Sequence, residues 1–192
     1  MTTIAVVKKA GRIAIAADTL TKWGLGKESA AYIVNHTKLM QVGDSWLAVS
    51  GNATFKHVLD DWFVHPTRKN TPLRSAGEIF TAWQKLHKAL KEDYYLRPEE
   101  QQDDALESSR MDVLIANPWG IFGVSGMRTV QEYARFYAYG SGTEIALGAL
   151  FATYDLADRD AESLARLAIE AAAEFDDGTG LPIETRVMAQ QA

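Results

Sequence analysis

The order of apolar patterns along this chain predicts an α+β fold in which two stacked sheets lie between two layers of helices. Short apolar runs recur in pairs that are typical of antiparallel strands, and helical spacing appears as two separate pairs between them. An order of strands, two helices, strands, two helices and a last strand favours such layers over alternating parallel units. This order permits a four-layer αββα sandwich without requiring it.

The composition is that of one folded domain spanning residues 1–192. The 192 residues suffice for a core without crosslinks, and 47% of them are hydrophobic. A net charge of −5 gives no basic surface for nucleic acid, and the lack of cysteine excludes disulfides, thiolate zinc sites and cysteine nucleophiles. The most apolar run, 145–152, is too short to span a membrane. We therefore expect a cytoplasmic protein that has neither nucleic acid nor a membrane as a partner.

The first half of the chain is expected to contain a strand-rich part followed by two helices. Its predicted strands are 4–7, 13–17, 30–34, 38–42 and 46–49. A hairpin connection, 8–12, joins the first two, and 19–27 is predicted as a loop because polar and turn-forming residues are frequent there. Apolar residues at three- and four-residue steps then predict one helix that Pro66 closes and another over 75–94.

The second half repeats this order. Its predicted strands are 111–116, 120–124, 130–133, 136–139 and 182–188. A helix predicted over 142–154 is apolar nearly all round and is expected to be well buried. Another, over 161–175, follows Asp160, a residue type that caps helices. The acidic stretch 97–110 lacks periodicity and is predicted to be a solvated loop.

The first residues of the chain carry a candidate chemistry. Met1 precedes a small residue and is expected to be removed, which would leave Thr2 with a free α-amine. A threonine hydroxyl is a weak nucleophile until a base takes its proton, and an α-amine, with an ordinary pKa of about 7.7–8.0, suits that task. Met-Thr-Thr also opens many proteins that do no chemistry, so these residues alone favour an ordinary N-terminus.

Three distant residues could supply what such a threonine needs. Asp18 ends the second predicted strand, close to the start of the first, and Lys38 begins a later strand. A lysine beside an acid and an amine lowers the pKa of nearby hydroxyl and amine groups. Gly51 lies between a strand and a helix, where backbone N–H groups are free to face an oxyanion. Taken singly, each residue also has a structural explanation. Asp18 could form a turn, Lys38 could be a solvated strand lysine, and Gly51 could permit a close backbone approach.

Ser141 has two interpretations. It has capping-box spacing with Glu144 at the start of a predicted helix, although a capping serine can still present its hydroxyl to a site. A Ser-His-acid site is disfavoured because Gly140-Ser141-Gly142 does not match the nucleophile elbow of such hydrolases. The four histidines lie far upstream and lack metal-ligand spacing: His36, His57, His65 and His87.

Together these segments resemble the N-terminal threonine hydrolases of the proteasome β-subunit family, which includes the bacterial HslV peptidase. The opening Thr2-Thr3-Ile4, followed by Gly11 and by 13–18, resembles the start of HslV. Further segments match in the right order: Lys38, Ser50-Gly51-Asn52-Ala53, Gly140-Ser141-Gly142 and Asp176-Asp177-Gly178-Thr179. Among the branches of the family, the bacterial proteasome homologue is the most similar.

The resemblance implies a role for each matched residue. Thr2 is the nucleophile, and Asp18 and Lys38 set the local field. The N–H of Gly51 binds the oxyanion. Three residues hold the threonine amine and its water: Ser141, Asp176 and Thr179. Three residues are substrate-pocket candidates by position: Val49, Ala53 and His36. No metal or organic cofactor is implied, apart from a weak monovalent cation site near Asp176 and Thr179.

The resemblance also implies an N-terminal nucleophile αββα fold and a self-compartmentalising threonine peptidase that cleaves peptides or unfolded proteins through an acyl-enzyme. Such subunits form homo-oligomers of stacked hexameric or heptameric rings. The resemblance leaves open whether an ATP-dependent unfoldase is a partner. Two alternatives remain. One is a catalytically latent chamber that acts as a binding module, and the other is an amidase of the same family that acts on a small amide. Thr2 can act only once Met1 is gone.

Overall fold

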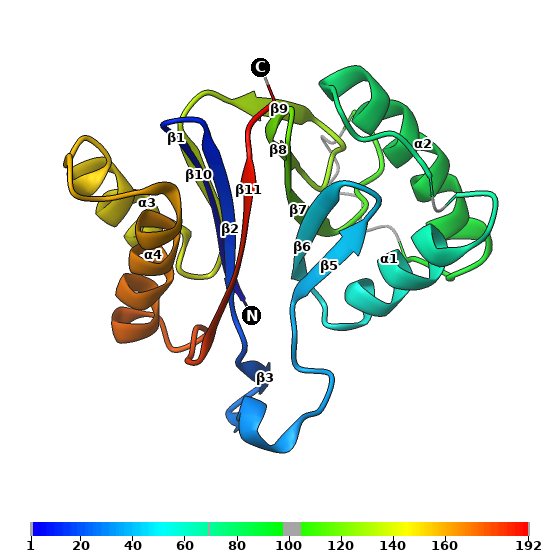
Figure 1. The fold of residues 1–192 in the computed structure, drawn as a ribbon. Coiled ribbons are helices and arrows are strands. Elements are labelled where there is room, and N and C mark those ends of the chain that lie inside the picture. The colour runs from blue at the N-terminus through cyan, green and yellow to red at the C-terminus, as the bar shows by residue number, and fades with distance from the viewer. Residues whose placement is uncertain (1, 69, 98–104, 192) are drawn as a thin grey trace.

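The computed structural model describes residues 2–68, 70–97 and 105–191, and it confirms the four-layer αββα sandwich. Two antiparallel sheets stack face to face, with one pair of helices outside each sheet (Figure 1). None of the helices in the described ranges is both long and apolar enough to cross a membrane.

The first sheet has the strand order β10-β1-β2-β11 and the second the order β5-β6-β7-β8-β9. The strands of the first are β1 (Thr3–Lys9), β2 (Arg12–Asp18), β10 (Phe136–Gly140) and β11 (Ile183–Ala189). Those of the second are β5 (Leu39–Val42), β6 (Ser45–Gly51), β7 (Met111–Asn117), β8 (Gly120–Val124) and β9 (Val130–Tyr133). The chain ends join the first sheet, so its edge and centre hold segments from both ends of the sequence.

The helices come in the two predicted pairs. They are α1 (Thr54–Val64) and α2 (Ala76–Glu92) beside the second sheet, and α3 (Thr143–Thr153) and α4 (Ala161–Phe175) beside the first (Figure 1). The predicted cap of α4 is confirmed, because the Asp160 carboxylate accepts the backbone N–H of Ser163 and the Ser163 hydroxyl accepts the N–H of Asp160.

Alternation along β1 explains how one strand serves two cores. Ile4 and Val6 face the other sheet, where they pack with residues such as Leu114. Ala5 faces the opposite way, toward a cluster that includes Ala168 of α4. Small side chains on both surfaces let α4 approach the sheet closely, which fixes the position of the first strand and of the residues that precede it.

Two predictions for the segment between β2 and β5 are wrong. The predicted loop 19–27 contains a short hairpin, β3 (Thr21–Trp23) and β4 (Gly26–Glu28). The predicted strand 30–34 is a 3-10 helix, η1 (Ala30–Tyr32), because the Ser29 hydroxyl caps it by accepting the N–H of Ala31. β5 pairs with β6 instead, so the apolar run 30–34 has no sheet to join.

The prediction of an all-round buried third helix is also wrong. Of the residues of α3, Ala146 and Leu150 are buried, whereas Phe151 is 83% exposed. The helix packs on β10, β1 and α4 from one side, so its outer apolar side chains meet solvent. In the predicted loop 97–110, residues 98–104 lie outside the described ranges, and Glu107 forms an ion pair with Lys91.

Candidate active site

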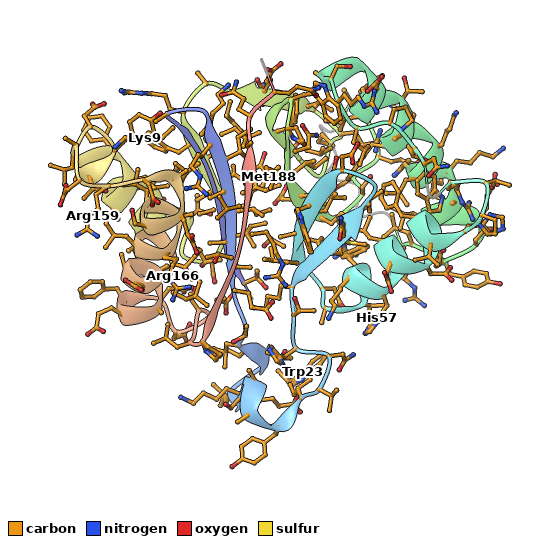
Figure 2. All side chains as sticks on the ribbon, in the orientation of Figure 1. Lys9, Trp23, His57, Arg159, Arg166 and Met188 are labelled. Atoms are coloured by element: carbon orange, nitrogen blue, oxygen red, sulfur yellow. The ribbon has the colours of Figure 1, made fainter. Side chains whose placement is uncertain are left out.

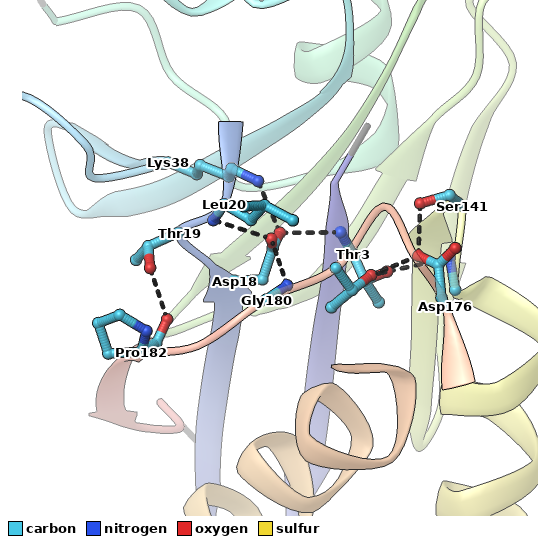
Figure 3. A network of polar contacts seen from close by, with 11 residues as sticks. Thr3, Asp18, Thr19, Leu20, Lys38, Ser141, Asp176, Gly180 and Pro182 are labelled. Carbon is cyan, nitrogen blue, oxygen red and sulfur yellow. Dashed lines mark hydrogen bonds and ion pairs between the residues drawn. The ribbon is translucent and has the colours of Figure 1, made fainter. Parts of the chain in front are cut away.

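The start of β1 and the end of β2 lie side by side because the two strands are antiparallel neighbours. Ile4 pairs with Ala17, which brings Thr2 and Thr3 next to Asp18. On the other side β1 pairs with β10, and Thr3 lies opposite Gly140. The loops before α3 and after α4 complete the surroundings (Figure 3). Segments from four parts of the sequence therefore meet around the first two threonines.

Asp18 is fully buried and accepts four hydrogen bonds. Its Oδ1 accepts from Lys38 Nζ at 2.7 Å and from the Thr3 N–H at 3.0 Å. Its Oδ2 accepts from the N–H groups of Leu20 and Gly180, both at 3.1 Å. The carboxylate therefore holds the lysine ammonium in one place beside the start of β1 (Figure 3).

Burial changes the acidity of both members of this pair. It raises the pKa of Asp18, and the Lys38 ammonium and the N–H groups of Thr3 and Gly180 oppose that rise. It lowers the pKa of Lys38, while the Asp18 carboxylate opposes that fall. The lysine thus carries a proton that it releases more readily than an exposed lysine does.

A second polar network lies on the opposite side of Thr3. The Asp176 Oδ2 accepts the hydroxyls of Ser141 at 2.6 Å and Thr179 at 2.5 Å. Partial burial raises the pKa of Asp176, but these two hydrogen bonds, the Gly178 N–H and the Lys22 charge together outweigh it and hold the pKa below its ordinary value. The structure thus brings together the three residues that the resemblance assigned to the threonine amine.

Thr3 links the two networks and was not predicted from the sequence. Its hydroxyl is buried, accepts the Gly142 N–H at 3.0 Å and lies 2.5 Å from the Thr179 hydroxyl. Because Thr179 donates its proton to Asp176, Thr3 donates to Thr179. Nothing in the sequence spacing indicates this, since both partners lie more than a hundred residues away.

The residues before α3 position the backbone of Thr2. The Ser141 N–H donates to the Thr2 carbonyl at 2.9 Å. Gly140 has φ of +113°, and a Cβ there would lie 1.7 Å from the same carbonyl oxygen. The predicted capping box with Glu144 is wrong, because Gly142 is the N-cap without a side-chain hydrogen bond and the Ser141 hydroxyl binds Asp176.

A cavity of about 360 Å³ opens beside Thr2. Five other predicted residues line it: Lys38, Gly51, Val49, Ala53 and His36. Gly51 has φ of +136°, and a Cβ there would lie 3.1 Å from the Arg110 carbonyl, so the backbone at this wall needs glycine. Larger hollows exist elsewhere on the molecule, but Thr2 does not line them.

The cavity also contains residues that sequence reasoning missed. Trp23 and Glu28 come from the β3–β4 hairpin, and Lys56 and His57 come from the first turns of α1 (Trp23 and His57 are labelled in Figure 2). Their approach depends on tertiary structure. The hairpin was predicted as a loop, and an α1 side chain can be assigned to a pocket only after the sheet is placed.

No metal centre is formed by the part of the chain that the structure describes, since no group of three or more histidine, aspartate or glutamate residues there is arranged to hold an ion. The weak monovalent cation site predicted near Asp176 and Thr179 would rest on other oxygen ligands. It stays a prediction.

The chain is similar over its whole length to BPH of Thiobacillus denitrificans, for which two solved structures match. One, in complex with epoxomicin, is 56% identical, with a TM-score of 0.94 and coverage of 100% of both chains. The other is 57% identical, with a TM-score of 0.94 and coverage of 99% of both chains. Eukaryotic HslV from Trypanosoma brucei shares the fold, with a TM-score of 0.67 at 20% identity, over 98% of this chain and 100% of that one.

A sequence match points the same way over a shorter range. The proteasome subunit beta of Nanoarchaeum equitans (strain Kin4-M) is 37% identical over 81 residues, which are 38% of this chain and 41% of that subunit. The chain thus matches less than half the length of that subunit. No model of a known protein family matches the chain.

Proposed function

This chain belongs to the proteasome β-subunit and HslV family of N-terminal threonine hydrolases, and from that membership we propose that it is a threonine peptidase that cleaves peptides or unfolded proteins. The observation that carries the proposal is the position of Thr2. It lines a cavity together with Lys38 and Gly51, between a buried acid–lysine pair and a hydrogen-bonded serine–aspartate network.

The reaction would proceed through an acyl-enzyme. After removal of the residue before it, the Thr2 Oγ1 attacks the substrate carbonyl carbon, and its proton passes to the Thr2 α-amine. The oxyanion accepts the Gly51 N–H. When the C–N bond breaks, the ammonium returns its proton to the leaving amine. Water then attacks the ester carbonyl carbon and gives a proton to the amine. As the ester C–O bond breaks, that proton passes to the Thr2 Oγ1, and the peptide acid leaves.

The surrounding residues would prepare Thr2 for each step. The Lys38 ammonium, fixed by Asp18, favours the deprotonated hydroxyl and the neutral amine. The network of Ser141, Asp176 and Thr179 lies beside the Thr2 backbone and would hold the amine and the attacking water. Val49, Ala53 and His36 would contact the substrate side chain from the cavity wall.

We further propose that the chain works as a homo-oligomer. Stacked rings of six or seven subunits would enclose the Thr2 cavities in a chamber and restrict entry to unfolded chains. An ATP-dependent unfoldase would be needed only for folded substrates. The number of subunits in a ring, the stacking of rings and the unfoldase partner are proposed from the family resemblance.

The test compares wild type with Thr2→Ala and Thr2→Ser on fluorogenic peptides and an unfolded protein, with the N-terminal mass measured in each sample. We expect wild type that starts at Thr2 to be active, the alanine variant to be inactive, and the serine variant to keep measurable activity because it retains a hydroxyl. Epoxomicin, which binds the Thiobacillus BPH, should raise the unfolding temperature of wild type.

The alternatives give different results in the same experiment. Equal activity of wild type and Thr2→Ala excludes threonine catalysis. Retention of Met1 in protein from its native host would refute the mechanism and favour a catalytically latent chamber that acts as a binding module. A stable monomer or dimer that cleaves only small amides would favour an amidase.

A further inference from the structure

The cavity beside Thr2 contains a positive charge that the proposed reaction does not use. Lys56, in the first turn of α1, lines this cavity and is half-buried. Its Nζ donates to the backbone carbonyl of Asn35 at 2.6 Å. Asn35 lies three residues before Lys38, so the Lys56 side chain reaches from the helix to the segment that carries the proposed catalytic lysine.

The other lysines of the cavity wall are already paired with acids. Lys38 is paired with Asp18, and Lys22 is paired with Asp177. Lys56 differs, because no carboxylate in residues 2–68, 70–97 and 105–191 lies within 4.0 Å of its Nζ. Its hydrogen-bond acceptor, a backbone carbonyl, is neutral. A partly desolvated ammonium of this kind gains from an anionic partner.

The pKa shifts of Lys56 and Lys38 are consistent with a partly desolvated ammonium close to the site. Burial lowers the pKa of Lys56, and the more distant carboxylates of Asp60 and Glu184 oppose that fall. Burial lowers the pKa of Lys38, Asp18 raises it, and the charge of Lys56 lowers it further. The Lys56 charge is therefore close enough to the site to act on Lys38.

We propose that Lys56 makes the cavity selective for peptides with an aspartate or glutamate at the residue whose carbonyl Thr2 attacks. This inference rests on the proposed peptidase function. In this proposal the attacked carbonyl lies at the Thr2 hydroxyl and the side chain of the same residue enters the adjoining cavity, which Thr2 and Lys56 both line. A carboxylate there accepts a charge-assisted hydrogen bond from Lys56.

The test uses two fluorogenic peptides that differ only in glutamate or glutamine at that residue, which changes charge at constant size. We expect wild type to favour the glutamate peptide about 10-fold in kcat/KM. The ratio should fall to about one in Lys56→Gln and persist in Lys56→Arg, since the charge is the cause. The ratio is the readout because the loss of Lys56 also alters Lys38, which affects both peptides alike.

A binding measurement separates this inference from the proposed function. Thr2→Ala is titrated calorimetrically with product peptides that end in glutamate or glutamine at that residue. Tighter binding of the glutamate peptide to Thr2→Ala, lost when Lys56→Gln is added, supports the selectivity. It does so even if wild type cleaves neither substrate, because the absence of cleavage would refute only the peptidase function. Equal binding of the two peptides, or a preference that survives Lys56→Gln, overturns the inference.

Discussion

At the scale of single residues, Thr3 joins the two polar networks of the site. Its N–H donates to Asp18 at 3.0 Å, while its hydroxyl lies between the Gly142 N–H and the Thr179 hydroxyl. The side chain is fully buried, so water cannot replace either hydrogen bond. We infer that Thr3 is a positioning residue, which acts through Asp18 and Asp176 without contact with substrate.

Replacing Thr3 with valine tests this role, because valine keeps the shape and removes the hydroxyl. The Gly142 N–H then lacks an acceptor and Thr179 loses a donor. We expect kcat to fall about 10- to 100-fold with KM nearly unchanged, because the proposed reacting groups shift while the cavity does not. Steady-state kinetics below the unfolding temperature measure this. Thr3→Ser should recover most of kcat, and an equal loss in both variants would contradict the positioning role.

The pH dependence of kcat/KM follows from two groups with opposite requirements. The Thr2 amine acts as a base only when neutral, and the Lys38 ammonium favours that form, so activity should rise with pH below the ordinary α-amine pKa of about 7.7–8.0. Lys38 acts only when charged, so activity should fall as it loses its proton. Burial lowers the Lys38 pKa from 10.5, so this fall should begin below that pH. A pH profile measures both limbs, and full activity beyond pH 10.5 would count against the role of Lys38.

The sequence predicted the site residues that sit at strand ends, but not those that depend on the fold. Asp18 ends β2, so its position beside Thr2 follows from the antiparallel pairing of β1 and β2. Gly51 ends β6 of the other sheet and reaches the Thr2 cavity because the two sheets stack. Thr3 and Lys56 have ordinary sequence surroundings. Their roles come from contacts across 139 or more residues for the Thr3 hydroxyl and from the docking of α1 for Lys56.

At the scale of elements, α4 begins with a reciprocal cap that should be measurable. The Asp160 carboxylate accepts the Ser163 N–H at 2.8 Å, and the Ser163 hydroxyl accepts the Asp160 N–H at 3.0 Å. We expect Asp160→Ala to lower the free energy of unfolding by about 1 kcal/mol, because the Ser163 N–H then loses its side-chain acceptor. Denaturant unfolding measures this. Asp158→Ala, which changes a nearby exposed acid, should have little effect, and equal losses in the two variants would exclude the cap as the cause.

The elements whose periodicity is strong were predicted correctly, and two of the misses share one cause. The helix α4 has a polar face, so its buried face could be identified. In α3 and in 30–34 the apolar residues do not mark a buried face, because Phe151 and Tyr32 are exposed. The apolar residues of these two segments therefore do not indicate which side chains lie in the hydrophobic core.

At the scale of the whole molecule, several exposed apolar side chains line one groove, although Phe151 lies outside it. A groove between the β3–β4 hairpin, η1 and the end of α4 is lined by four of them: Leu25, Tyr32, Phe175 and Leu181. Leu25 is 104% exposed and Tyr32 is 89% exposed. Charged residues such as Lys27 and Glu174 border these side chains, a mixture that is typical of subunit contacts, so we expect a second copy of the chain to cover the groove in the proposed homo-oligomer.

A charge in place of the exposed Leu25 side chain should weaken assembly and activity together. We expect wild type to sediment as an oligomer and Leu25→Lys to shift toward smaller species at equal concentration, because burial of an unpaired ammonium is costly. Val64→Lys adds the same charge to an exposed apolar residue outside the groove and should leave the sedimentation of the wild type unchanged. Asp176 and Thr179 line the same groove, so loss of the neighbouring copy should loosen their network and lower peptide cleavage too. A Leu25→Lys protein with the oligomer mass of wild type would place the subunit contact elsewhere.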